Sequence, residues 1–172
     1  FFLGSDRRTF TFLSVFKWEE RKNWRLLIES FWKAFPREPM PVVLDTGDVA
    51  LISVRLLIKT RKLHVGSDPQ EDLRELLSNL LAKQSPLKAR ELAARLHVVD
   101  GDIPTDMMPH LYSAADAFVL PTRGEGWGLP MMEAMASGVP SIATGWGGQI
   151  DFMHSENSKL LEYTLVPQPL TK

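Results

Sequence analysis

Short apolar runs alternate with helical patterns along most of this chain. Residues 10–16 are rich in aromatic and β-branched types and predict a buried strand, and a charged turn follows at 17–22. Apolar residues then recur at helical spacing from Trp24 to Phe35, where Pro36 ends the helix. A second apolar run at 49–59 predicts another strand. Strands that alternate with helices predict an α/β fold with a doubly wound, mostly parallel sheet.

The second half of the chain continues this alternation. Asp68 and Pro69 open a long helical pattern that Pro86 divides in two. Further strands are expected at 97–100, 117–120 and 140–144, and helices at 107–115, from Pro130 to near Gly138, and at 147–154. The proline-rich segment 36–47 is expected to be a loop. In a sheet of this kind ligands bind beyond the carboxyl ends of the strands, and the candidate loops below all follow strands.

Length and composition narrow the function classes. The 172 residues suit one domain, and a formal net charge of −1 provides no overall field for nucleic acid. Cysteine is absent, so thiol nucleophiles and cysteine zinc sites are excluded and a reducing, cytoplasmic location is expected. No apolar run has the length of a membrane span. The first residue is Phe1 rather than methionine, and we therefore expect the chain to be a fragment of a longer protein.

The most informative segment runs from Arg123 to Glu133. Gly126 and Gly128 allow the backbone to approach a ligand, and Pro130 starts a helix whose free N–H groups favour anionic, oxygen-rich groups. Glu125 in the loop can accept a sugar hydroxyl, and Glu133 can accept the two hydroxyls of a ribose. A plain helix start with an acid near its dipole explains Glu133, but it does not explain three glycines around Glu125.

Three further segments have both a functional and a structural interpretation. Lys17 and Lys22 stand five apart in a strand-to-helix turn, where they can bind one diphosphate or form a solvated charged turn. The segment 100–104 spells Asp-x-Asp, which we interpret as a polar turn rather than a metal site. The segment 144–151 holds a glycine pair before a short helix, and that pair can approach a sugar or a phosphate. The four histidines share no metal-ligand spacing.

Residues 114–140 resemble the signature of retaining GT-B glycosyltransferases of glycosyltransferase family 4, the group 1 type, and the two glutamates resemble its Glu-x7-Glu motif. The resemblance implies a Rossmann-like, carboxy-terminal domain, one half of a GT-B architecture, that binds a nucleoside-diphosphate sugar. It places Lys17, Lys22 and Glu125 in catalysis. The residues it implies for donor binding are Lys17, Lys22, Ile103, Glu125, Gly126, Trp127, Gly128, Leu129 and Glu133. Ile103 would stack on the base, Glu125 and the residues after it would contact the sugar, and Glu133 would hold the ribose.

The resemblance covers roughly residues 10–166 of a single domain, 1–172, and departs from the family at two positions. Lys17 stands where the family has Arg, and Asp151 where it often has Glu. It implies sugar transfer with retention, without a metal, a cofactor or a protein nucleophile, and the amino-terminal acceptor-binding domain is missing. The chain should therefore bind a donor but not catalyse efficiently alone. A non-catalytic nucleotide-sugar-binding module or subunit is the alternative, whereas a dinucleotide oxidoreductase lacks its glycine motif after the first strand.

Overall fold

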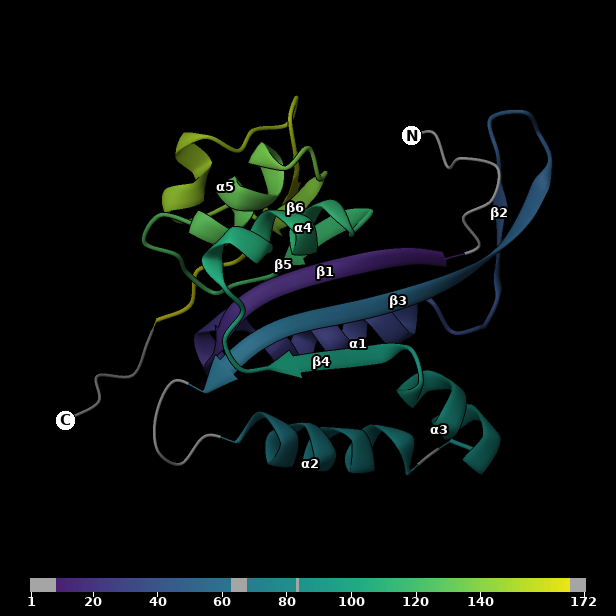
Figure 1. Cartoon of the computed structure of the whole chain (residues 1–172). Coiled ribbons are helices and arrows are strands. Elements are labelled where there is room, and N and C mark those ends of the chain that lie inside the picture. The colour runs from purple at the N-terminus through teal and green to yellow at the C-terminus, as the bar shows by residue number, and fades with distance from the viewer. Residues whose placement is uncertain (1–8, 63–67, 83, 168–172) are drawn as a thin grey trace.

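The computed structural model describes residues 9–62, 68–82 and 84–167. Its sheet has the strand order β2-β3-β1-β5-β6-β7, and β4 pairs with β3 (Figure 1). Every strand pair is parallel except that of β2 with β3. The predicted fold class is therefore confirmed. The strands are β1 (Thr9–Trp18), β2 (Met40–Val43), β3 (Val49–Lys62), β4 (Leu96–Asp100), β5 (Ala117–Leu120), β6 (Ser141–Thr144) and β7 (Lys159–Leu161).

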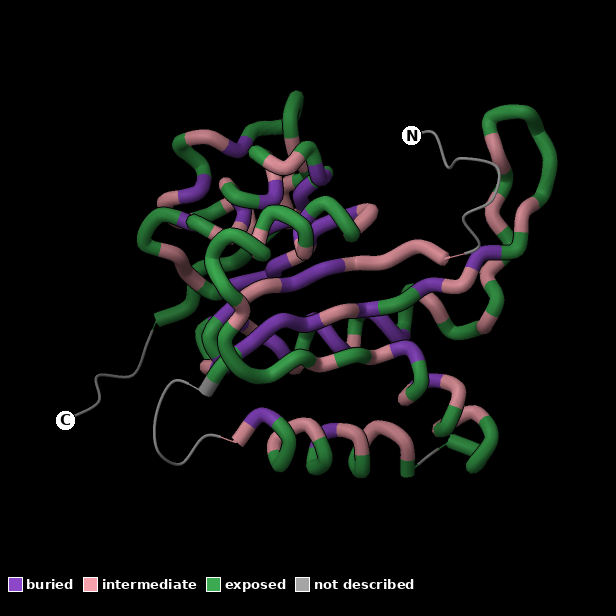
Figure 2. The backbone as a smooth tube through the Cα atoms, in the orientation of Figure 1, coloured by how far each residue is buried: buried purple, intermediate pink, exposed green. Residues whose placement is uncertain are grey.

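The two long strands β1 and β3 form the centre of the sheet. They pair in parallel over ten residues, with Thr9 opposite Ser53 and Trp18 opposite Lys62. β5 joins the other side of β1. One face of β3 is buried from Ile52 to Thr60, whereas the other face is only partly covered and Arg55 on it is exposed (Figure 2). The turn that follows β1 is therefore attached to a central strand of the sheet.

Two of the five helices begin at a capping side chain that the sequence places there. They are α1 (Trp24–Ala34), α2 (Pro69–Leu81), α3 (Pro86–Ala93), α4 (Met108–Ser113) and α5 (Leu129–Ala136), with 3-10 turns η1 (Glu20–Lys22), η2 (Thr105–Met107) and η3 (Gly148–Asp151). The Asp68 side chain accepts from the N–H groups of Gln70 and Glu71, and the Ser85 side chain from that of Lys88. The predicted division of the long helical pattern at Pro86 is confirmed.

Aromatic side chains fix α1 against β1. The rings of Trp18 and Trp24 stack with centroids 4.3 Å apart, and Phe12 packs against Phe31 and Phe35. Fully buried Leu13, Ile28 and Leu56 complete this part of the core. Aromatic rings bury more apolar area than any other side chains, so this packing anchors the end of β1 and the turn that follows it.

Several elements differ from the sequence predictions. The expected loop 36–47 contains β2, an edge strand that forms a hairpin with β3 and projects from the sheet (Figure 1). Pro41 is tolerated because an edge strand has one row of N–H groups that needs no partner. β3 extends to Lys62, three residues past its predicted end, and β7 is too short to leave a sequence signal. The last expected helix is the single 3-10 turn η3.

Candidate functional site

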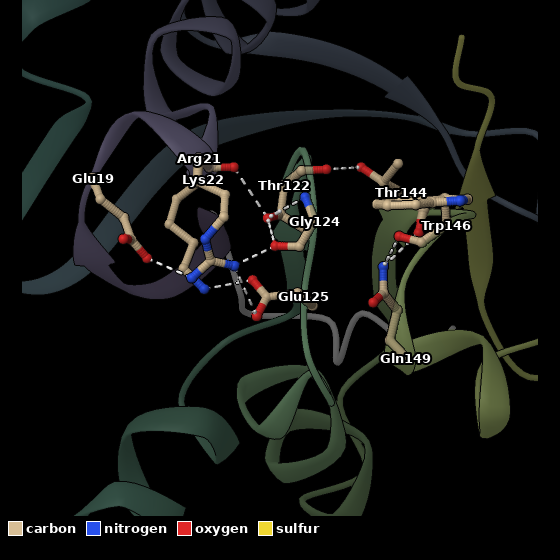
Figure 3. Close-up of polar contacts among 9 residues, drawn as sticks. All are labelled: Glu19, Arg21, Lys22, Thr122, Gly124, Glu125, Thr144, Trp146 and Gln149. Carbon is tan, nitrogen blue, oxygen red and sulfur yellow. Dashed lines mark hydrogen bonds and ion pairs between the residues drawn. The ribbon is translucent and has the colours of Figure 1, made fainter. Parts of the chain in front are cut away.

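The candidate site lies at the carboxyl ends of β1, β3, β5 and β6. The turn η1 follows β1, the loop 121–128 follows β5, and the loop 145–147 follows β6. Carboxyl ends of parallel strands meet at one edge of a sheet, which explains why these loops lie side by side in the close-up (Figure 3). The segments singled out in the sequence are thus gathered at one edge.

Lys22 and Glu125 form the central ion pair of the site. Lys22 Nζ lies 2.5 Å from Glu125 Oε1, and each side chain is only 8% exposed (Figure 3). The turn can present Lys22 inward because Asn23 adopts a left-handed conformation, with φ of 59°, between η1 and α1. A ligand that reaches Lys22 or Glu125 would therefore meet a buried pair of opposite charges and not two separate groups.

Arg21 is a second cation beside Glu125, and it was not among the residues predicted from the sequence. One guanidinium nitrogen donates to the Gly124 carbonyl and lies 3.7 Å from Glu125 Oε2, and the other lies 2.6 Å from Glu19. The Arg21 carbonyl in turn accepts from the Arg123 N–H. The signal was present, since Arg21 precedes Lys22 in the charged turn, but only the fold shows which side chain of that turn faces the loop after β5.

Lys17 belongs to a separate pocket. The structure places Lys17 in β1, since the strand runs to Trp18, so its predicted position in the turn is wrong. A pocket of about 270 Å³ is lined by Lys17 at the end of β1, by Ile103 after β4 and by Pro130 at the start of α5. The end of β1, the loop after β4 and the start of α5, which the sequence singled out separately, therefore line one pocket. Its other lining residues are Val15, Phe16, Lys59, Thr60, Arg61, Asp102 and Met108.

Lys59 is a buried residue in the lining of this pocket, and it too was not predicted from the sequence. Its ammonium donates to the Thr60 carbonyl at 3.0 Å and to the Gly101 carbonyl, which ties the end of β3 to the loop after β4. Burial lowers the pKa of Lys59 from its ordinary value, while the carboxylates of Asp102 and Asp100 oppose that shift. The sequence had shown Lys59 only as the polar end of an apolar run.

The predicted Asp-x-Asp turn has no metal-binding partners in the part of the chain that the structure describes. Asp102 is highly exposed and lies 3.5 Å from Arg61. Within residues 9–62, 68–82 and 84–167 no three His, Asp or Glu side chains are grouped so as to hold a metal ion. Ile103, in contrast, is half-buried and lines the pocket, as a surface for a planar ring requires.

The glycine-rich loop leads into α5. Gly128 caps the helix with φ of 92°, which favours glycine, and the helix begins at Leu129, one residue before the predicted first position at Pro130. The side chains of Trp127 and Leu129 are about half exposed, and Gly126 is exposed. Pro130 has no N–H group, and the N–H groups of Met131 and Met132 donate to the Gly128 carbonyl. An oxygen-rich group at this helix start would therefore bind amides that precede Pro130.

Glu133 lies one turn into α5 and is held by a buried tyrosine. Tyr112 donates its hydroxyl proton to Glu133 Oε2 at 2.7 Å, and Glu133 itself is exposed. Burial, and then the Glu133 carboxylate, raise the pKa of Tyr112 well above its ordinary value. Tyr112 therefore stays a hydrogen-bond donor at neutral pH and orients the carboxylate. The predicted contact of Glu133 with a ribose remains a prediction.

None of the helices in the described ranges combines the length and apolar character needed to cross a bilayer.

A family model described as glycosyl transferases group 1 matches residues 7–168. Among curated proteins, the mannosylfructose-phosphate synthase of Agrobacterium fabrum is 31% identical over 127 residues, 74% of this chain and 23% of that protein. The chain spans about a quarter or less of the length of the curated relatives it matches first.

Solved structures show the same fold. HepE of Anabaena, crystallised in complex with UDP-glucose, superposes with a TM-score of 0.66 at 18% identity, over 90% of this chain and 35% of HepE. The carboxy-terminal domain of a group 1 family protein, LpcC, from Francisella tularensis superposes with a TM-score of 0.59 at 22% identity, over 88% of this chain and 67% of that domain. The chain thus shares its architecture with one Rossmann-like domain of GT-B proteins.

Proposed function

Because the chain belongs to the group 1 glycosyl transferases, we propose that it is the domain that binds a nucleoside-diphosphate sugar for retaining transfer to an acceptor. The observation that carries the proposal is the pocket in which Lys17, Ile103 and Pro130 meet. It offers an apolar surface for a base and a cation for a phosphate, and it lies beside the start of α5. HepE, a structural neighbour, was crystallised with UDP-glucose, which supports the same ligand class here.

The site contains the charges that the reaction needs. Sugar transfer breaks the bond between the anomeric carbon and a phosphate oxygen, so negative charge grows on the departing diphosphate. Preorganised cations and helix N–H groups lower the barrier to that step. Lys17, Lys22 and the start of α5 would supply them, and Lys22 would then share its charge between Glu125 and the phosphate. Glu125 and the amides of Gly126 to Leu129 would hold the sugar, and Glu133 the ribose.

The test is a calorimetric titration of the chain with UDP, GDP and ADP and with their glucose or mannose conjugates. One nucleotide series is expected to bind, and Lys17→Ala should weaken its diphosphate about tenfold while leaving the free nucleoside unchanged. Lys33→Ala, an exposed lysine on α1 outside this pocket, is the control. If no member of any series bound to the unmodified chain, the proposal would be wrong.

Transfer itself needs the longer protein that the family architecture implies, with an acceptor-binding domain amino-terminal to this chain. In that protein the product should keep the anomeric configuration of the donor, which NMR of the product reads directly. A protein that binds donor but transfers nothing to any acceptor would instead be a binding module.

A further inference from the structure

Two glycine-rich loops of the site are in direct backbone contact. The N–H of Gly148 donates to the Glu125 carbonyl at 3.0 Å, and a Cβ added to Gly148 would lie 2.0 Å from the carbonyl oxygen of Gly126. A Cβ on Gly147 would lie 3.1 Å from the Glu125 carbonyl oxygen. Because no side chain separates the loops, the second loop, 145–148, fixes the position of the backbone at Glu125 and Gly126.

The Gln149 side chain is hydrogen-bonded to the backbone at the start of the second loop. Its side-chain nitrogen donates to the carbonyls of Thr144 at 2.8 Å and Trp146 at 2.9 Å, and the residue is fully buried (Figure 3). Both partners are acceptors, so the orientation of the amide is fixed by the hydrogen bonds. The Gln149 side chain thus ties the end of β6 to the middle of the loop that contacts Glu125.

The other atoms of Gln149 show that packing alone does not require a glutamine. Its Oε1 is buried and has no hydrogen-bond partner among the described residues, which disfavours an amide over an apolar side chain of the same length. Its Cβ would be only 2.9 Å from a Cβ added to Gly128, the cap of α5. Gln149 therefore contacts both glycine loops, and its two donated hydrogen bonds offset the unpaired oxygen.

We propose that Gln149 is a positioning residue for the sugar part of the donor. It holds the loop 145–148 so that the backbone of Glu125 and Gly126, and the Glu125 carboxylate with it, stays where the sugar binds. This inference rests on the proposed function. Gln149 does not line the pocket of Lys17 and Ile103, so its effect falls on the sugar and not on the nucleotide.

The test compares UDP with UDP-glucose, or the GDP or ADP pair if the titration panel selects that base. Gln149→Met keeps the length of the side chain and removes both donors. We expect it to weaken UDP-glucose binding about tenfold to a hundredfold, the effect of a misplaced contact group, with less than a twofold change for UDP. Ile150→Ala, a neighbouring exposed side chain, is the matched control and should change neither affinity.

Each outcome decides the proposal. An equal loss for UDP and UDP-glucose, or no loss, would overturn the role of Gln149 while leaving the proposed function intact. Failure of the unmodified chain to bind either ligand would overturn both. If Gln149→Met does not fold, Gln149→Asn, which keeps the amide on a shorter stem, carries the test. It should lower the affinity for UDP-glucose selectively, and a variant with unchanged affinity for both ligands would refute the positioning role.

Discussion

The two parts of the site differ in how firmly they are held before any ligand arrives. Around the glycine loops, Lys22 and Glu125 are both buried, and Gln149 ties the supporting loop with two hydrogen bonds. Around the pocket, Lys17 and Asp102 are exposed, whereas the buried Lys59 donates to two backbone carbonyls. The proposed sugar end is therefore preformed, whereas the exposed side chains at the proposed nucleotide end would lose conformational freedom if a ligand bound.

The strongest way to break this comparison is to force the two glycine loops apart. Gly148→Ala places a methyl group on the Gly126 carbonyl and should lower the free energy of unfolding by about 4 kcal/mol or more, since backbone rather than a flexible side chain must move. Gly126→Ala meets nothing within 4 Å and should change stability by less than about 0.5 kcal/mol. Urea denaturation followed by tryptophan fluorescence measures both. Equal stabilities would refute the close packing of the loops.

Lysine substitutions sharpen the contrast between the two ends. Lys22→Ala removes the buried cation of Glu125 and leaves only the half-exposed Arg21 beside it, which should cost about 3 kcal/mol of stability. Lys17 is exposed, and Lys17→Ala should cost less than about 0.5 kcal/mol. The double variant Lys22→Ala with Glu125→Ala should recover part of the loss, because no unpaired charge remains. Thermal and urea unfolding give these values, and a Lys17 variant as unstable as the Lys22 variant would contradict the comparison.

Tyr112→Phe tests whether the orientation of Glu133 is built in. Loss of the hydrogen bond should lower stability by about 1 kcal/mol. Because the pKa of Tyr112 is raised in the folded protein, the folded state keeps the proton above pH 10, where an unfolded tyrosine releases it. Stability should therefore fall as the pH rises above about 10, and fall less in the Phe variant. Parallel denaturation curves at pH 8 and above pH 10, run on both proteins, are the measurement.

Of the residues that contact Glu125 through a charge, Arg21 is expected to contribute less than Lys22. Its side chain is 46% exposed, so solvent screens its pairs with Glu19 and Glu125, and Arg21→Ala should cost under about 1 kcal/mol. The difference in unfolding free energy between the unmodified chain and Arg21→Ala should be smaller in 1 M salt than in 0.1 M salt, and denaturation of both proteins at the two salt concentrations measures it. A loss as large as that of Lys22→Ala would place Arg21 in the preformed part of the site. Arg25→Ala, another partly exposed arginine with an acidic partner, provides the control.

The sequence predicted the parallel sheet, the helix boundaries at Pro36 and Pro86 and the loops of the site, because these depend on local patterns such as apolar periodicity and proline. It did not predict Arg21, Lys59 or Gln149. Their roles depend on which carbonyl or carboxylate lies opposite, and that is fixed by pairing between distant strands. Lys17 was predicted to lie in a turn because most residues from 17 to 22 are charged, although β1 continues to Trp18.

The same limit explains the hairpin of β2 and β3. Met40–Val43 is short and contains a proline, a composition that favours a loop by local rules. The pairing of Val43 with Val49 across the turn at Asp45 to Asp48 overrides those rules. Edge strands of this kind are stabilised by one neighbour only, so their sequence carries a weaker signal than that of a central strand.

The contacts that build the site join residues that are far apart in the chain. Lys22 and Glu125 are 103 positions apart, and the Thr11 N–H donates to Asp116 over a separation of 105. Each contact of such long range requires the entropy of closing the intervening chain to be lost first. During synthesis, the turn after β1 is therefore made long before the loop after β5, and Lys22 has no buried partner until Glu125 has been added to the chain.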